Sequence, residues 1–105
     1  MSTRDMQPVR RREDRIPMEI PVVLDGHRLV PGTESTFTEN VSTKGARVIS
    51  VRRWEKGSPV VFASGTGEFR SAARVAYCQP IRGDGFAIGV EFLETKGRWV
   101  VESTN

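Results

Sequence analysis

Alternation of inward-facing and outward-facing residues along short segments is the feature that most constrains the fold of this chain. A period of two is typical of β-strands with one buried face, and no long segment follows the helical period of about 3.6 residues. Strands are also predicted at residues 33–41 and 59–63. The residues predicted to share one face of their strand are Ile20, Val22 and Leu24; Ala46, Val48 and Ser50; Phe69, Ser71, Ala73, Val75 and Tyr77; and Phe86, Ile88, Val90 and Phe92.

The connections between these segments contain turn-forming residues. Asp25-Gly26, Gly65-Thr66-Gly67 and Gly83-Asp84-Gly85 each separate two predicted strands. Six short strands joined in this way predict an all-β domain, folded as an antiparallel barrel or sandwich. A six-stranded antiparallel β-barrel is attractive because closure leaves no exposed strand edge.

The length of 105 residues corresponds to one domain. We predict a flexible basic arm at residues 1–15, the barrel at 16–94 and a C-terminal tail at 95–105. The arm has no sustained periodicity and therefore no core of its own. Gly97, Val100 and Val101 are poor helix formers, so the tail is expected to contain at most a short C-terminal helix.

Several classes of protein are disfavoured by the composition. No apolar run is long enough to span a bilayer, and the polar N-terminus does not resemble a signal peptide, so a cytoplasmic location is expected. Cys78 is the only cysteine, which excludes an internal disulfide. His27 is the only histidine, and one histidine with one cysteine cannot form a common zinc site. His27 follows a turn glycine and is expected in solvent.

Positive charge is concentrated near the N-terminus. Residues 4–15 hold five arginines and three carboxylates, a surplus of two charges, whereas the whole chain carries +3. Such a local surplus indicates a discrete anion site rather than a broad basic face. Guanidinium groups bind phosphate oxygens bidentately and stack on flat aromatic rings, so a ligand with phosphates and purines would use both properties.

Two short motifs carry the functional signal. Residues 11–15, RREDR, match RxxxR, and residues 40–45, NVSTKG, match NxSxxG at the junction of two predicted strands. Asn and Ser side chains shape turns by bonding to the local backbone, and Gly45 permits positive φ or the close approach of a ligand. An ordinary β-turn would account for NVSTKG alone, and a solvated tail would account for the arginines alone.

Together and in this order, the two motifs resemble the PilZ family of bacterial receptors for the second messenger cyclic di-GMP. The segment 88–92, IGVEF, is similar to a late PilZ strand, and the resemblance covers about residues 10–93. It implies a six-stranded PilZ-type barrel. PilZ domains commonly close with a C-terminal helix, and this chain departs from that pattern because it ends soon after Phe92.

The resemblance also implies roles for single residues. Arg11 and Arg15 would bind the phosphates of cyclic di-GMP and stack against its guanines. Asn40, Ser42 and Gly45 would form the opposite wall, with Asn40 and Ser42 hydrogen-bonding to guanine. Ligand binding would order the N-terminal arm on the barrel and alter a surface that contacts an unidentified protein partner.

Arg10 directly precedes RxxxR. In many PilZ domains an arginine at this place accompanies the binding of two intercalated ligand molecules, which predicts two cyclic di-GMP molecules per chain. Two ligands bring four phosphate charges together, and the Arg10 guanidinium would offset part of their repulsion.

Catalysis is not indicated. Glu91 and Glu94 are three residues apart, which predicts opposite faces of one strand and a poor acid–base pair. We therefore predict a binding protein and not an enzyme. Two alternatives remain: a PilZ-like adaptor that binds proteins but no nucleotide, and a small barrel that binds single-stranded nucleic acid, which the near-neutral body disfavours.

Overall fold

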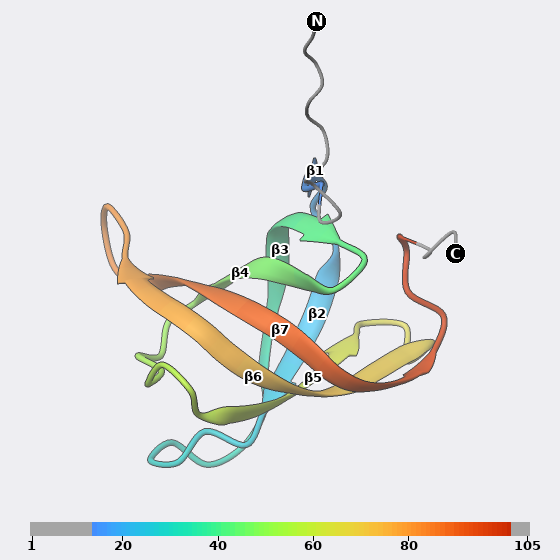
Figure 1. Cartoon of the computed structure of the whole chain (residues 1–105). Coiled ribbons are helices and arrows are strands. Elements are labelled where there is room, and N and C mark those ends of the chain that lie inside the picture. Colours follow the sequence, from blue (N-terminus) through green and yellow to red (C-terminus); the bar gives the residue numbers. More distant parts are fainter. Residues whose placement is uncertain (1–13, 102–105) are drawn as a thin grey trace, which may run out of the picture.

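The computed structural model describes residues 14–101 (Figure 1). All regular structure in this range is β, and no helix is present in it. The strands are β1 (Ile16–Pro17), β2 (Pro21–Asp25), β3 (Glu34–Ser42), β4 (Gly45–Ser50), β5 (Pro59–Ser64), β6 (Phe69–Pro80) and β7 (Phe86–Gly97). The strand β7 runs three residues beyond the expected barrel end at residue 94.

Six of these strands form a closed antiparallel barrel. The order β3-β2-β5-β6-β7-β4 is completed by pairing between β4 and β3. This confirms the predicted six-stranded barrel. The two-residue β1 is an addition, pairing with the end of β3 through Ile16↔Val41 and Pro17↔Asn40. Of the predicted arm, only Asp14 and Arg15 belong to the described residues.

The core follows the predicted alternation over most of its extent. Val22, Leu24, Val48 and Val75 are almost fully buried, and the partly buried Cys78 packs against the same core. Their burial stabilises the fold because each removes apolar surface from water. Two buried residues, Trp54 and Trp99, lie in segments outside the strands.

Within residues 14–101, Trp99 covers one end of the barrel core, and no helix takes part. Its ring centroid lies 4.8 Å from that of Phe69 and 5.2 Å from that of Phe92. Its indole Nε1 donates a hydrogen bond to the carbonyl oxygen of Ser42 at 2.9 Å. The segment after β7 therefore covers the core and at the same time contacts the end of β3.

Three β-bulges interrupt the alternation. Each bulge contains one extra residue that has no partner in the neighbouring strand. The extra residues are Glu39 in β3, Ala76 in β6 and Leu93 in β7. Each extra residue reverses which side of the sheet the following residues face. Tyr77 therefore pairs with Gly89 and not with the core-facing Val90, so its predicted place on the same face as Val75 is wrong.

The bulge at Leu93 overturns a second prediction. Glu91 pairs with Arg74, and Glu94 pairs with Ala72, which lies two residues away on the same side of β6. Glu91 and Glu94 thus share the outer face instead of lying on opposite faces. Glu91 is ion-paired with Arg74, a contact that is absent for Glu94 among residues 14–101.

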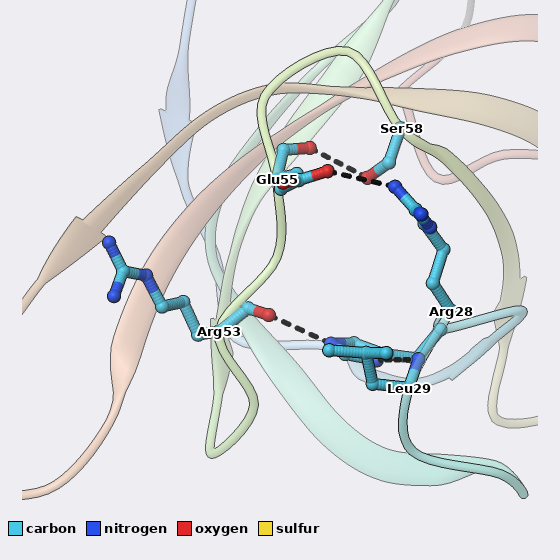
Figure 2. A network of polar contacts seen from close by, with 6 residues as sticks. Arg28, Leu29, Arg53, Glu55 and Ser58 are labelled. Atoms are coloured by element: carbon cyan, nitrogen blue, oxygen red, sulfur yellow. Dashed lines mark hydrogen bonds and ion pairs between the residues drawn. The ribbon is translucent and has the colours of Figure 1, made fainter.

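The loops at residues 26–33 and 51–58 are joined at the opposite end of the barrel (Figure 2). His27 is not simply solvated: its Nε2 contacts the carbonyl of Arg53 at 2.8 Å, and its Nδ1 accepts the backbone N–H of Leu29 and of Val30, each at 3.1 Å. The N–H donors fix the tautomer, so Nε2 carries the proton and donates to Arg53.

Candidate ligand-binding site

The short strand β1 places Arg15 beside the NxSxxG motif. The Thr38 hydroxyl donates to the carbonyl of Met18 at 2.7 Å and accepts the N–H of Ile20 at 3.0 Å, which fixes the segment between β1 and β2. Arg15 Nη1 then donates to Asn40 Oδ1 at 2.8 Å. Two motifs that are 25 residues apart in sequence are therefore in direct contact.

The bulge at Glu39 decides where Asn40 points. Thr38 is buried and pairs with Val48, so strict alternation would turn Asn40 towards the core as well. With one extra residue, Asn40 pairs instead with Arg47 on the outer face. Bulges commonly re-aim side chains at functional sites, and this one exposes the amide of Asn40.

The turn between β3 and β4 is held by Ser42. Its Oγ accepts the N–H of Lys44 at 3.2 Å, and the side chain is almost fully buried. Ser and Gly at the first and last positions are typical of a type I turn, and neither central residue, Thr43 or Lys44, has a positive φ. The buried hydroxyl of Ser42 therefore shapes the turn.

Gly45 is required for a different reason from the positive φ considered from the sequence. Its φ is not positive. A Cβ at this position would overlap the backbone carbonyl oxygen of Val90, because β4 and β7 approach closely through the pair Gly45↔Glu91. Gly45 thus permits close packing of the two strands behind the turn.

A cleft of about 390 Å³ lies between Arg15, this turn and the outer faces of β6 and β7. Its charged lining residues are Arg15, Lys44 and Glu91. The ammonium group of Lys44 has no ion-pair partner within residues 14–101. An anionic ligand would therefore meet two cations at the side of the cleft that is formed by the turn.

Tyr77 provides the flat surface of this cleft. Its ring covers Gly89, where a Cβ would overlap the ring atoms. The guanidinium carbon of Arg47 lies 5.7 Å from the ring centroid, and Arg47 Nη1 donates to the Tyr77 hydroxyl at 3.1 Å. These contacts fix the orientation of the ring.

Arg47 is in turn held by Glu39, at 2.8 Å from Nε to Oε1. The hydrogen bond that Arg47 donates to Glu39, followed by the one it donates to Tyr77, raises the pKa of Arg47 above its ordinary value. Arg47 is therefore a permanent cation beside the cleft. No group of side chains suited to a metal ion occurs within the described part of the chain.

The structure brings together four of the six predicted site residues: Arg15, Asn40, Ser42 and Gly45. Arg10 and Arg11 lie outside the described residues. Sequence reasoning missed Lys44, Tyr77 and Glu91 as parts of the site. Lys44 occupies a variable position of NxSxxG, and the pairing of Tyr77 with a glycine is not visible along the chain.

Comparison with protein families matches residues 9–98 to the PilZ domain. The chain belongs to the PilZ family. This match includes both motifs, the six strands of the barrel and the short strand β1. PilZ domains are known as cyclic di-GMP receptors, and they are binding or adaptor domains rather than catalysts.

Two further observations complete the comparison. A search of curated proteins gave no significant match. Within residues 14–101, no helix has the length and apolar character needed to cross a membrane.

Proposed function

We propose that this PilZ domain is a cyclic di-GMP receptor and that the ligand binds in the cleft beside Arg15. The observation that carries the proposal is the hydrogen bond from Arg15 to Asn40, which joins the RxxxR and NxSxxG motifs. Membership of the PilZ family supports the same ligand class. The cleft offers cations for phosphates and an aromatic ring for a base.

In this proposal, the phosphates of the ligand bind to Arg11 and Arg15, with Lys44 as an additional cation. Charge-assisted hydrogen bonds are shorter and stronger than neutral ones, and the bidentate guanidinium matches a phosphate. Asn40 Oδ1 already accepts from Arg15, so the Asn40 amide NH₂ is the group that would donate to guanine. Tyr77 supplies a face on which a guanine would stack.

Ser42 and Gly45 line the cleft, and we propose that they contribute to ligand binding indirectly. The Ser42 hydroxyl is buried and bonded to the turn, and Gly45 accommodates the backbone of β7. They would maintain the position of Lys44 in the wall of the cleft and of Asn40 beside Arg15. A direct bond from Ser42 to guanine would require the hydroxyl to leave its present partner.

Ligand binding would also act on the N-terminal segment. Because Arg10 and Arg11 precede the ordered contact at Arg15 by only a few residues, a ligand that binds all three would fix the segment 1–15 over the cleft. The changed surface would then bind a protein partner.

We further propose two intercalated cyclic di-GMP molecules per chain, with Arg10 facing the second.

Titration calorimetry with cyclic di-GMP tests the receptor proposal, with GTP and a short single-stranded DNA as comparison ligands. Arg15→Ala removes a phosphate contact and should weaken binding by about one to two decades. Arg53→Ala removes the same charge from the other end of the barrel and serves as the matched control. Its guanidinium points away from the loop contacts in Figure 2.

The outcomes separate the alternatives. Absence of binding to cyclic di-GMP at high micromolar concentration would refute the receptor proposal and favour the nucleotide-free adaptor. Tighter binding of DNA than of cyclic di-GMP would favour the nucleic-acid barrel, although Trp54 and Trp99 are both buried and are not available for stacking. Stoichiometry of two in wild type, falling towards one in Arg10→Leu, would support the proposed role of Arg10.

A further inference from the structure

Glu91 is a carboxylate in a cleft that is otherwise suited to an anion. It lines the cleft together with Arg15 and Lys44, and its side chain is 45% exposed. A negative charge at this place repels the phosphates of a nucleotide. An acidic residue at this position therefore does not contribute to phosphate binding.

The position of Glu91 relative to Tyr77 suggests another role. The Tyr77 ring covers Gly89, and Glu91 is two residues further along β7 on the same outer face. Residues so spaced on a strand are about 7 Å apart. A base that stacks on the Tyr77 ring would therefore present one edge towards the Glu91 carboxylate.

Glu91 is also held in place. Arg74 Nη2 donates to Glu91 Oε1 from the neighbouring strand β6. This contact occupies one oxygen of the carboxylate, and a carboxylate has about four acceptor sites in total. The ion pair is half exposed, so its own contribution to stability is small, about 0–1 kcal/mol. The pair therefore positions a carboxylate that retains acceptor capacity.

We propose that Glu91 is a specificity-determining residue that selects guanine over adenine. An ionised carboxylate only accepts hydrogen bonds. The Watson–Crick edge of guanine offers two adjacent donors, N1–H and the N2 amino group, whereas adenine offers one donor, the N6 amino group, beside the acceptor N1. Glu91 thus favours guanine twice, by binding its donors and by repelling the acceptor of adenine. This inference rests on the proposed function and names the selectivity of that site.

The selectivity of the wild-type protein is tested by measuring its affinity for three cyclic dinucleotides by calorimetry. Cyclic di-GMP offers both donors, cyclic di-IMP lacks the N2 amino group, and cyclic di-AMP presents the acceptor. We expect affinity to fall in that order, by about tenfold or more at each step, which corresponds to one charge-assisted hydrogen bond. Equal affinity for all three ligands would overturn the role of Glu91.

The variant Glu91→Gln isolates the carboxylate. A glutamine amide has one donor and one acceptor group, which suits the edge of adenine as well as that of guanine. We expect the ratio of cyclic di-GMP to cyclic di-AMP affinity to fall by about tenfold or more. Glu94→Gln is the matched control, because Glu94 shares the outer face but does not line the cleft.

The result separates this inference from the receptor proposal. If wild type binds none of the three ligands, the receptor proposal fails and the selectivity proposal fails with it. If wild type binds cyclic di-GMP but Glu91→Gln keeps the wild-type affinity ratio, only the role of Glu91 is wrong. A uniform gain in affinity for all three ligands would show that Glu91 merely repels phosphate, which also contradicts its role in selection.

Discussion

The two ends of the barrel contain cavities of nearly equal size but different chemistry. One cavity, of about 400 Å³, lies between the loops at residues 26–33 and 51–58, and the candidate cleft of about 390 Å³ lies beside the β3–β4 turn. These regions are separated by the length of β4, which runs from Gly45 at the turn to Ser50 at the loops. Arginines occur at both, so neither cavity size nor arginine content distinguishes them.

The polar groups at the loop end are bonded mainly to the backbone of the two loops. His27 bonds to three backbone groups, Ser58 Oγ donates to the carbonyl of Glu55 at 2.6 Å, and Arg28 pairs with Glu55 (Figure 2). Such bonds define the conformation of the loops. The ring of His27 also packs edge-on against Trp54, with centroids 4.6 Å apart.

The cleft end is arranged differently. Its main polar contacts join one exposed side chain to another, as in Arg15 to Asn40 and Arg74 to Glu91. Exposed side-chain pairs contribute little to stability and can exchange partners at low cost. The comparison teaches that partners decide the role of a polar cluster: backbone partners indicate a structural brace, and exchangeable partners beside a cleft indicate a ligand site.

The largest effect on this comparison is expected from Gly45→Ala. The added Cβ would overlap the Val90 carbonyl oxygen, so β4 and β7 could not keep their present distance. We expect the free energy of unfolding to fall by more than about 4 kcal/mol, in the exceptional range for one substitution. At the loop end, the Cβ added by Gly57→Ala would lie in open space. Only the φ of +88° at this position would be strained, which should lower the free energy of unfolding by about 1–2 kcal/mol.

Urea denaturation followed by tryptophan fluorescence measures both glycine variants. A loss for Gly45→Ala no larger than that for Gly57→Ala would show that the strands can separate locally. In that case Gly45 would no longer need a packing explanation, and a direct role in ligand binding would gain support.

An intermediate effect is expected from His27→Ala. The variant removes the partner of two N–H groups and one carbonyl in a partly exposed loop, and it should lower the free energy of unfolding by about 1–2 kcal/mol. Cyclic di-GMP affinity should stay within about twofold of wild type, because the loop is at the other end of the barrel. A larger loss of affinity would show that the loop end takes part in binding.

The smallest effects on stability separate Ser42 from Asn40. Ser42→Ala removes a buried hydroxyl that accepts the Lys44 N–H, so it should cost about 0.5–1.5 kcal/mol of stability and some affinity. Asn40→Ala should leave stability within about 0.5 kcal/mol of wild type, as for other exposed substitutions, and lower affinity for cyclic di-GMP. Denaturation and calorimetry on both variants check this division. Unchanged affinity in both would reduce NVSTKG to an ordinary turn.

Much of this fold could be predicted because its information is local. The alternation at Val22 and Leu24, or at Phe69, Ser71 and Ala73, states which side of each strand is buried. Burial of apolar side chains then allows one face only to point inwards, and closure follows from the need to pair strand edges. The motifs RxxxR and NxSxxG are also local, so the family was identifiable from the sequence.

Only the tertiary structure determines that the side chains of the site residues face outwards. Asn40 and Tyr77 face the outer side because Glu39 and Ala76 each have no partner in the adjacent strand. A bulge is a difference in length between two paired strands, so it belongs to the pairing and is not visible in either strand alone. The same holds for Gly45, whose requirement comes from the carbonyl of Val90 on a strand more than forty residues away in sequence. Local patterns along the chain therefore specify the strands and the family, whereas the register between strands determines which side chains meet at the cleft.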